Sequence, residues 1–142
     1  MSAYADTSLL VSLYVFDSNS ARAAAQIKRV NLPVWLTAFG EIELTNAFHL
    51  RIFRRELRLA QVRVAQALFR KDMEGGVFEL RNLTPQVFER AKLIAQKHTP
   101  RLGTRTLDLL HVASALELEA DTFLTFDHRQ NELAKAEGLR VP

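Results

Sequence analysis

The sequence predicts an α/β fold, in which a central, mostly parallel sheet of four to five short strands is flanked by helices. Short apolar runs alternate with helical segments along the chain, which is typical of parallel strands joined by helical crossovers. Two of these runs end on an acid, Asp6 and Asp127. The chain has 142 residues, of which 48% are hydrophobic and 25% charged, as expected for one globular domain over residues 1–142.

The first half of the chain is divided by hydroxyl, proline and glycine residues. Thr7 or Ser8 is placed to cap a helix, Asp17 to cap an alanine-rich one, and Pro33 precedes an apolar run. The expected elements are a strand over 2–6, a helix from about residue 7, a helix over 17–30, a strand over 34–36, and a helix over 37–55.

The second half shows the same alternation. A turn near Arg58 separates two helices, and Gly75 with Gly76 ends the second of them. Thr84 and Pro85 mark a helix start, and Thr104 or Thr106 is placed to cap the next helix. The expected elements are a strand over 77–80, a helix over 86–97, an apolar helix over 107–118, a strand over 122–126, a helix over 128–137, and an edge strand over 139–141.

Charge and cysteine content limit the class of protein. The net charge is +3, and 14 of the 19 basic residues are Arg, whose fork of N–H groups suits phosphate. There is no Cys, which excludes disulfides, thiolate metal sites and cysteine nucleophiles. Asp6 and Asp17 interrupt the apolar N-terminal region, so neither a signal peptide nor a membrane span is expected. We therefore expect a soluble, cytoplasmic protein.

The segment from Arg51 to Lys71 is strongly basic and contains a single acid, Glu56. Three interpretations are open: the segment binds RNA phosphates, it is a solvated helical pair, or its apolar ridges bind a partner protein. Four aromatic side chains are expected in the core rather than on a base-stacking surface, namely Trp35, Phe39, Phe48 and Phe53.

The acidic residues indicate a metal site. Asp6 and Asp127 follow strands, where the carboxyl edge of a parallel sheet binds ligands, and Asp108 begins an apolar helix. A fourth acid, Glu41 or Glu43, belongs to the helix after the second strand, and periodicity does not choose between them. Gathered carboxylates repel one another unless a cation compensates, and oxygen ligands favour Mg²⁺ or Mn²⁺. His111, one turn after Asp108, is more consistent with a packed, hydrogen-bonded side chain than with a ligand.

Four short stretches together resemble the PIN domain, and specifically the VapC-type toxin ribonucleases of toxin–antitoxin pairs. The stretches are Tyr4-Ala-Asp-Thr-Ser8, Glu43-Leu-Thr-Asn-Ala47, Asp108-Leu-Leu-His-Val-Ala-Ser-Ala, and Thr125-Phe-Asp127. The resemblance spans essentially the whole chain. It implies a three-layer PIN-like fold and a Mg²⁺- or Mn²⁺-dependent endoribonuclease.

The resemblance also implies roles for particular residues and partners. The metal and the reaction are assigned to Asp6, Glu43, Asp108 and Asp127, with hydroxyl support from Thr7, Ser8 and Thr125. Glu43 fits the family pattern where Glu41 does not, and Asp127 tends to be the least tightly engaged acid. An RNA substrate, a cognate antitoxin protein and a homodimer are the expected partners. The alternatives are an RNA-processing nuclease of the same fold, or an inactive PIN module that binds RNA or protein.

Overall fold

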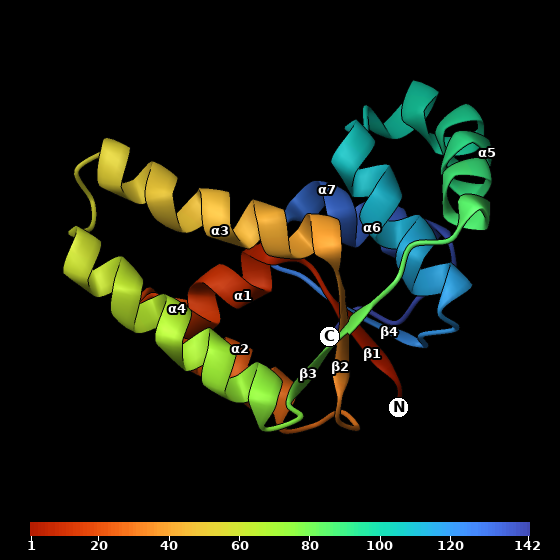
Figure 1. Ribbon diagram of the computed structural model, residues 1–142. Coiled ribbons are helices and arrows are strands. Elements are labelled where there is room, and N and C mark those ends of the chain that lie inside the picture. Colours follow the sequence, from red (N-terminus) through yellow and green to blue (C-terminus); the bar gives the residue numbers. More distant parts are fainter.

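A four-stranded parallel sheet lies between two groups of helices in the computed structural model, which describes all residues from 1 to 142 (Figure 1). The strands are β1 (Ala3–Ala5), β2 (Val34–Thr37), β3 (Phe78–Arg81) and β4 (Thr122–Leu124), in the order β3-β2-β1-β4. All three pairings are parallel. This confirms the predicted α/β fold with a parallel central sheet.

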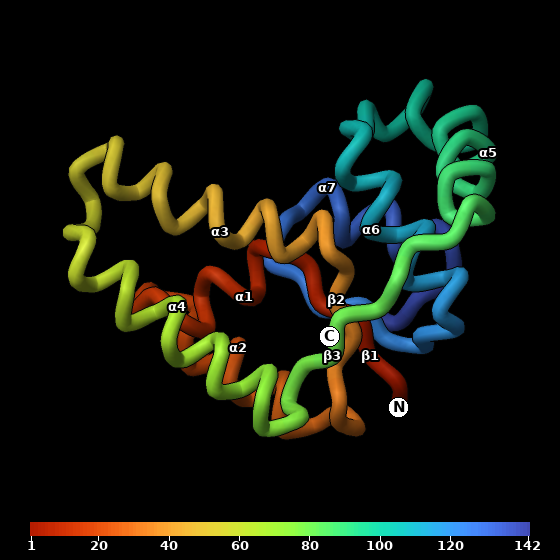
Figure 2. Tube along the Cα trace, viewed as in Figure 1, coloured from red at the N-terminus to blue at the C-terminus, as the bar shows by residue number.

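Seven helices cover the sheet. They are α1 (Thr7–Tyr14), α2 (Ser20–Ile27), α3 (Ala38–Phe53), α4 (Leu59–Glu74), α5 (Pro85–Leu102), α6 (Thr106–Glu117) and α7 (His128–Ala136). Figure 2 shows α3 and α4 as an antiparallel pair that extends beyond the sheet, with the turn between them at the far end. None of these helices combines the length and the apolar character that crossing a membrane requires.

Two hydrophobic cores lie on opposite faces of the sheet, as the alternation of side chains along a strand requires. Ala3 and Ala5 point into a core that includes side chains of α1 to α4, among them Phe48 and Phe69. Tyr4, between them, points into a second core formed with side chains of α5, α6 and α7. The molecule therefore has three layers, and the sheet is buried on both faces.

The N-terminal caps of α1 and α6 differ from the expected ones, whereas α5 begins at Thr84 and Pro85 as predicted. Asp6, not Thr7 or Ser8, caps α1, because its carboxylate accepts the backbone N–H of Leu9. Arg105 occupies the N-cap position of α6 instead of Thr104 or Thr106, and the Asp108 carboxylate accepts the Arg105 backbone N–H. In both cases an acid satisfies a free N–H at a helix start, which a hydroxyl was expected to do.

Several element ends also differ from the prediction. Asp17 lies before α2 rather than at its start, α5 continues through Pro100 to Leu102 with Gly103 as its cap, and β4 ends at Leu124. Gly103 has the left-handed conformation that commonly ends a helix, with φ of 63°. The expected edge strand over 139–141 is reduced to a single parallel bridge between Thr122 and Arg140.

One expectation about the core is wrong. Phe48 is 1% exposed and belongs to the core, and Trp35 and Phe39 are partly buried. Phe53, in contrast, is 83% exposed. It is the last residue of α3, at the end of the helix that extends past the sheet.

Candidate active site

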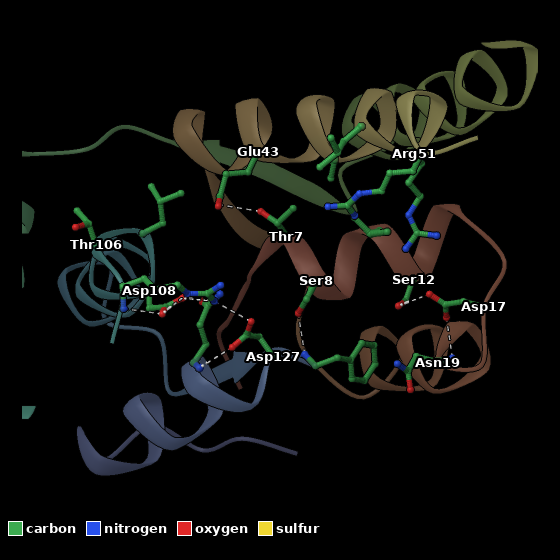
Figure 3. A pocket seen from close by; sticks show the side chains of 18 residues that line it. Thr7, Ser8, Ser12, Asp17, Asn19, Glu43, Arg51, Thr106, Asp108 and Asp127 are labelled. Carbon is green, nitrogen blue, oxygen red and sulfur yellow. Dashed lines mark hydrogen bonds and ion pairs between the residues drawn. The ribbon is translucent and has the colours of Figure 1, made fainter. Parts of the chain in front are cut away.

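An open cleft of about 780 Å³ lies between α1 and α3, at the carboxyl edge of the sheet (Figure 3). Its walls are one face of α1, one face of α3, and the starts of α6 and α7. The side chains that line it include Thr7, Ser8, Ser12, Asp17, Glu43, Arg51, Arg54, Arg105, Asp108 and Asp127. Because each of these helices follows a strand or a short loop at the same edge, residues far apart in sequence meet here.

Asp6 lies directly under this cleft and is fully buried. Ser8 Oγ donates to Asp6 Oδ1 at 2.7 Å, and Thr125 Oγ1 donates to Asp6 Oδ2. Burial raises the pKa of the Asp6 carboxyl above its ordinary value. The nearby His111 and the two hydroxyls act in the opposite direction but do not outweigh burial. Asp6 is thus a buried acid in which both oxygens already accept hydrogen bonds.

The same hydroxyls connect β4 to the start of α1. Ser8 Oγ accepts the backbone N–H of Phe126 at 2.9 Å, and Thr125 Oγ1 accepts the backbone N–H of Asp127 at 2.9 Å. Each hydroxyl therefore donates to Asp6 and accepts from the chain that leads to Asp127. This arrangement fixes the position of Asp127 relative to Asp6.

Glu43 projects from α3 into the cleft and belongs to a buried hydrogen-bond chain. Thr7 Oγ1 donates to Glu43 Oε1 at 3.0 Å, and His111 Nε2 donates to the same oxygen. His111 Nδ1 in turn accepts from the Tyr4 hydroxyl at 2.7 Å. Burial acts to raise the pKa of Glu43, but the hydrogen bonds from His111 and Thr7 outweigh it, so the pKa lies below its ordinary value. Glu43 is therefore held as a carboxylate.

Asp108 and Asp127 share one cation, the guanidinium of Arg105. Arg105 Nε and Nη2 each bind an oxygen of Asp108 at 3.0 Å, and Nη2 also binds Asp127 Oδ2 at 3.0 Å. Asp108 is 1% exposed, whereas 55% of the Arg105 side chain is accessible. The hydrogen bond that Arg105 donates to Asp108 raises the pKa of Arg105 above its ordinary value. A buried carboxylate is thus neutralised from the solvent side.

The structure brings most of the predicted site residues to this cleft. Glu43, Asp108, Asp127, Thr7 and Ser8 line it, while Asp6 and Thr125 lie buried below. Glu41, the alternative to Glu43, does not line the cleft. The expectation that His111 is packed and hydrogen-bonded agrees with its 1% exposure, and its contact with Glu43 also joins it to the acids.

Sequence reasoning missed Arg105. The available signal was its position three residues before Asp108, at the start of the same helix, where side chains meet across one turn. Tyr4 was likewise given no role of its own in the site, although its hydroxyl hydrogen-bonds His111 Nδ1.

The chemistry of the cleft fits a hard divalent cation. Carboxylates of Asp6, Glu43, Asp108 and Asp127, together with hydroxyls, supply only oxygen donors, which Mg²⁺ and Mn²⁺ prefer. The side chains as they stand do not gather three acidic or histidine residues closely enough to enclose an ion. The reason is visible in the contacts: Arg105 lies between two of the acids, and hydroxyls already occupy Asp6. Binding of a cation requires these partners to rearrange.

Residues 3–136 match the sequence profile of the PIN domain. The chain belongs to the PIN domain family. PIN domains are generally nucleases that use divalent metals, so an acid-lined cleft is the place where such chemistry is expected. The match also accounts for the three-layer fold described above.

Solved structures show the same PIN fold at low sequence identity. A toxin-antitoxin complex from Klebsiella pneumoniae aligns with a TM-score of 0.63 and 15% identity, over 89% of this chain and 87% of that chain. FitAcB from Neisseria gonorrhoeae aligns with a TM-score of 0.68 and 18% identity, over 98% of this chain and 95% of that chain. Among curated proteins, none matches this sequence.

Proposed function

We propose that this PIN domain is a Mg²⁺- or Mn²⁺-dependent endoribonuclease that acts as the toxin of a toxin–antitoxin pair. The main support is that three acids of a PIN domain, Glu43, Asp108 and Asp127, line one cleft, with Asp6 directly below them. The likeness of the fold to a chain of a toxin-antitoxin complex supports the biological role.

Asp6, Glu43, Asp108 and Asp127 would hold the metal in this proposal. When bound, the metal lowers the pKa of a water molecule and stabilises negative charge on the phosphate oxygens, as phosphodiester hydrolysis requires. The chain itself orients the acids. Thr7 and His111 fix one oxygen of Glu43, and Ser8 and Thr125 fix the carboxylate of Asp6. Water attack in line with the leaving oxygen yields a 5′-phosphate and a 3′-hydroxyl.

The proposed partners follow from the same role. RNA is the substrate, an antitoxin protein neutralises the enzyme, and two copies of the chain form a homodimer. Large apolar side chains lie exposed on α3 and α4, as protein-binding surfaces require; they are Ile42, Phe53, Leu59, Val64 and Leu68. An RNA substrate of this kind is met in the cytoplasm, where we expect the protein to act.

The test is cleavage of RNA by the purified protein in Mg²⁺, Mn²⁺ or EDTA. We expect cutting in either metal and none in EDTA. Asp6→Asn and Asp108→Asn should each lower the rate by at least about a hundredfold, because each removes a charge from the metal site. The products should carry 5′-phosphates.

Asp121→Asn is the matched control, since Asp121 is an exposed acid at the opposite end of β4 and lies outside the cleft. It should cut RNA like the unaltered protein. Cutting that persists in EDTA, or in both cleft variants, would contradict the metal mechanism. A protein that binds RNA without cutting it under any condition would instead be an inactive binding module.

A further inference from the structure

The cleft has a second end, which is basic rather than acidic. The residues of α3 that line it are Glu43, Ala47, Leu50, Arg51 and Arg54, whose spacing places them on one helix face. With a rise of about 1.5 Å per residue, Arg51 lies about 12 Å along the helix from Glu43, and Arg54 about 16 Å. One continuous cleft therefore leads from three acids to two guanidinium groups.

The two guanidinium groups are available to a ligand. Arg51 has one acidic neighbour, Glu56, at 3.8 Å, which is a long and partly exposed contact. Arg54 is exposed and forms no ion pair within 4 Å. An exposed pair of this kind contributes little to stability, so a phosphate can replace it at small cost.

An acid lies at this end of the cleft without neutralising these cations. Figure 3 shows Asp17 across the cleft from Arg51, next to Ser12. The Asp17 carboxylate instead accepts from Ser12 Oγ at 2.8 Å and from the Asn19 backbone N–H at 2.7 Å. Its oxygens are therefore held by α1 and by its own loop, and they form no ion pair with either arginine within 4 Å. Two guanidinium groups face one carboxylate at this end of the cleft, so the end keeps an excess of positive charge.

We propose that Arg51 and Arg54 bind backbone phosphates of a single-stranded RNA whose scissile phosphate lies at the acidic end. This inference rests on the proposed function, and it assigns cleavage to the acidic end of the cleft and phosphate binding to the basic end. A volume of about 780 Å³ is in the range of ordinary ligand pockets and suits a few nucleotides of single strand. Arg is also the side chain best shaped to grip a phosphate.

An acidic peptide fits the same cleft less well. It would bring carboxylates toward Glu43, Asp108 and Asp127, where only a phosphate has a chemical role. RNA carries a phosphate at every nucleotide, so one strand can place one phosphate among the acids and others on the arginines. Between the two ends, the hydroxyls of Thr7 and Ser12 keep the path polar.

The two arginines could also serve α3 itself, because cations near a helix C-terminus interact favourably with its dipole. That role would change the stability of the protein but not its response to salt when it binds RNA. The two roles are therefore separable by measurement.

The test compares Arg51→Gln/Arg54→Gln with the unaltered protein in binding a fluorescent single-stranded RNA. Anisotropy titrations are made in EDTA at several salt concentrations, so that binding is read without cleavage. Each lost phosphate contact should flatten the slope of log affinity against log salt by about 0.7, or about 1.4 for the pair. In Mg²⁺, KM for a long RNA should rise while kcat stays within about twofold, and a dinucleotide should be cut as before.

Arg63→Gln/Arg70→Gln is the matched control, since it removes the same charge from exposed positions of α4 outside the cleft. Its slope should stay close to that of the unaltered protein. Equal slopes for the cleft variant and the control would overturn the inference, as would binding of an oligo-glutamate peptide in place of RNA. Arginine-dependent binding without any cleavage would support the subsite and contradict the proposed nuclease.

Discussion

Arg105 determines whether Asp108 and Asp127, at the acidic end of the cleft, are free to bind a metal ion. It binds both Asp108 and Asp127, and its side chain is reached from solvent. A guanidinium lowers the repulsion between two carboxylates in the way that a metal ion would. A divalent ion and Arg105 should therefore compete for the same two acids.

We predict that Arg105→Gln destabilises the protein in EDTA and increases its response to Mn²⁺. Removing the partner of a buried carboxylate costs about 1–3 kcal/mol, and the variant no longer has a cation for Mn²⁺ to displace. Thermal unfolding in EDTA and across a Mn²⁺ titration measures both effects. The midpoint of the Mn²⁺ titration should fall to lower concentration in the variant.

Arg101→Gln supplies the comparison, because Arg101 is exposed in the last turn of α5 and does not bind these acids. It should unfold and respond to Mn²⁺ like the unaltered protein. The competition is ruled out if Arg105→Gln and Arg101→Gln have the same Mn²⁺ midpoint. No response to Mn²⁺ in any form would count against the metal site itself.

At the scale of elements, the start of α3 holds His111 against Glu43. Gly40 lies in the first turn of α3, and its backbone N–H donates to Thr37 Oγ1 at 3.3 Å. A Cβ at Gly40 would lie 3.5 Å from Thr37 Oγ1 and 3.6 Å from His111 Cε1, which are ordinary contact distances. Glycine is therefore not required here by space.

We predict that Gly40→Ala stabilises the protein by about 0.5–1 kcal/mol and leaves RNA cleavage unchanged, because alanine restricts the unfolded chain and favours helix while His111 keeps its place. Urea unfolding followed by circular dichroism gives the free energy. Gly40→Val should instead destabilise the protein, because its methyl groups press on His111. A loss of stability in the alanine variant would show that the first turn of α3 is tighter than the contacts indicate.

The order and type of the elements could be predicted from sequence, because apolar periodicity and turn residues are local signals. Caps were harder, since one carboxylate such as Asp6 can follow a strand, cap a helix and lie beneath a site at once. Periodicity did not choose between Glu41 and Glu43, because both faces of that helix are largely apolar in sequence, and the preference for Glu43 came from the family resemblance. Only the structure shows that Glu43 faces the cleft.

Phe53 was wrongly predicted to lie in the core, because sequence periodicity does not show where a helix extends beyond its sheet. The 16 residues of α3 span about 24 Å, while a strand of four residues spans about 13 Å. The end of α3 therefore has no sheet beneath it, and Phe53 lies in solvent. The overhang is the part of the molecule most suited to contact another chain.

At the scale of the whole molecule, we predict a homodimer that depends on Phe53. Light scattering on the protein as it elutes from a size-exclusion column should give a molar mass twice the 16.1 kDa of one chain. Phe53→Glu should give the mass of a single chain, because burying a charge at an interface is costly. Phe88→Glu is the control, on α5 and 49% exposed. A single-chain mass for the unaltered protein would contradict the dimer, and a dimer of Phe53→Glu would place the interface elsewhere.

Asp6 caps α1 and, in the proposed function, also helps to hold the metal. A substitution can remove the second role without the first. Asparagine caps a helix about as well as aspartate, whereas alanine forfeits about 1 kcal/mol. If the protein is the proposed toxin, a copy with the substitution Asp6→Asn would lose a charge from the metal site but keep its fold, and with it the surface that an antitoxin binds. Under the proposed function, the replacement of one carboxylate by an amide at position 6 would therefore convert the enzyme into an inactive form that still binds the antitoxin.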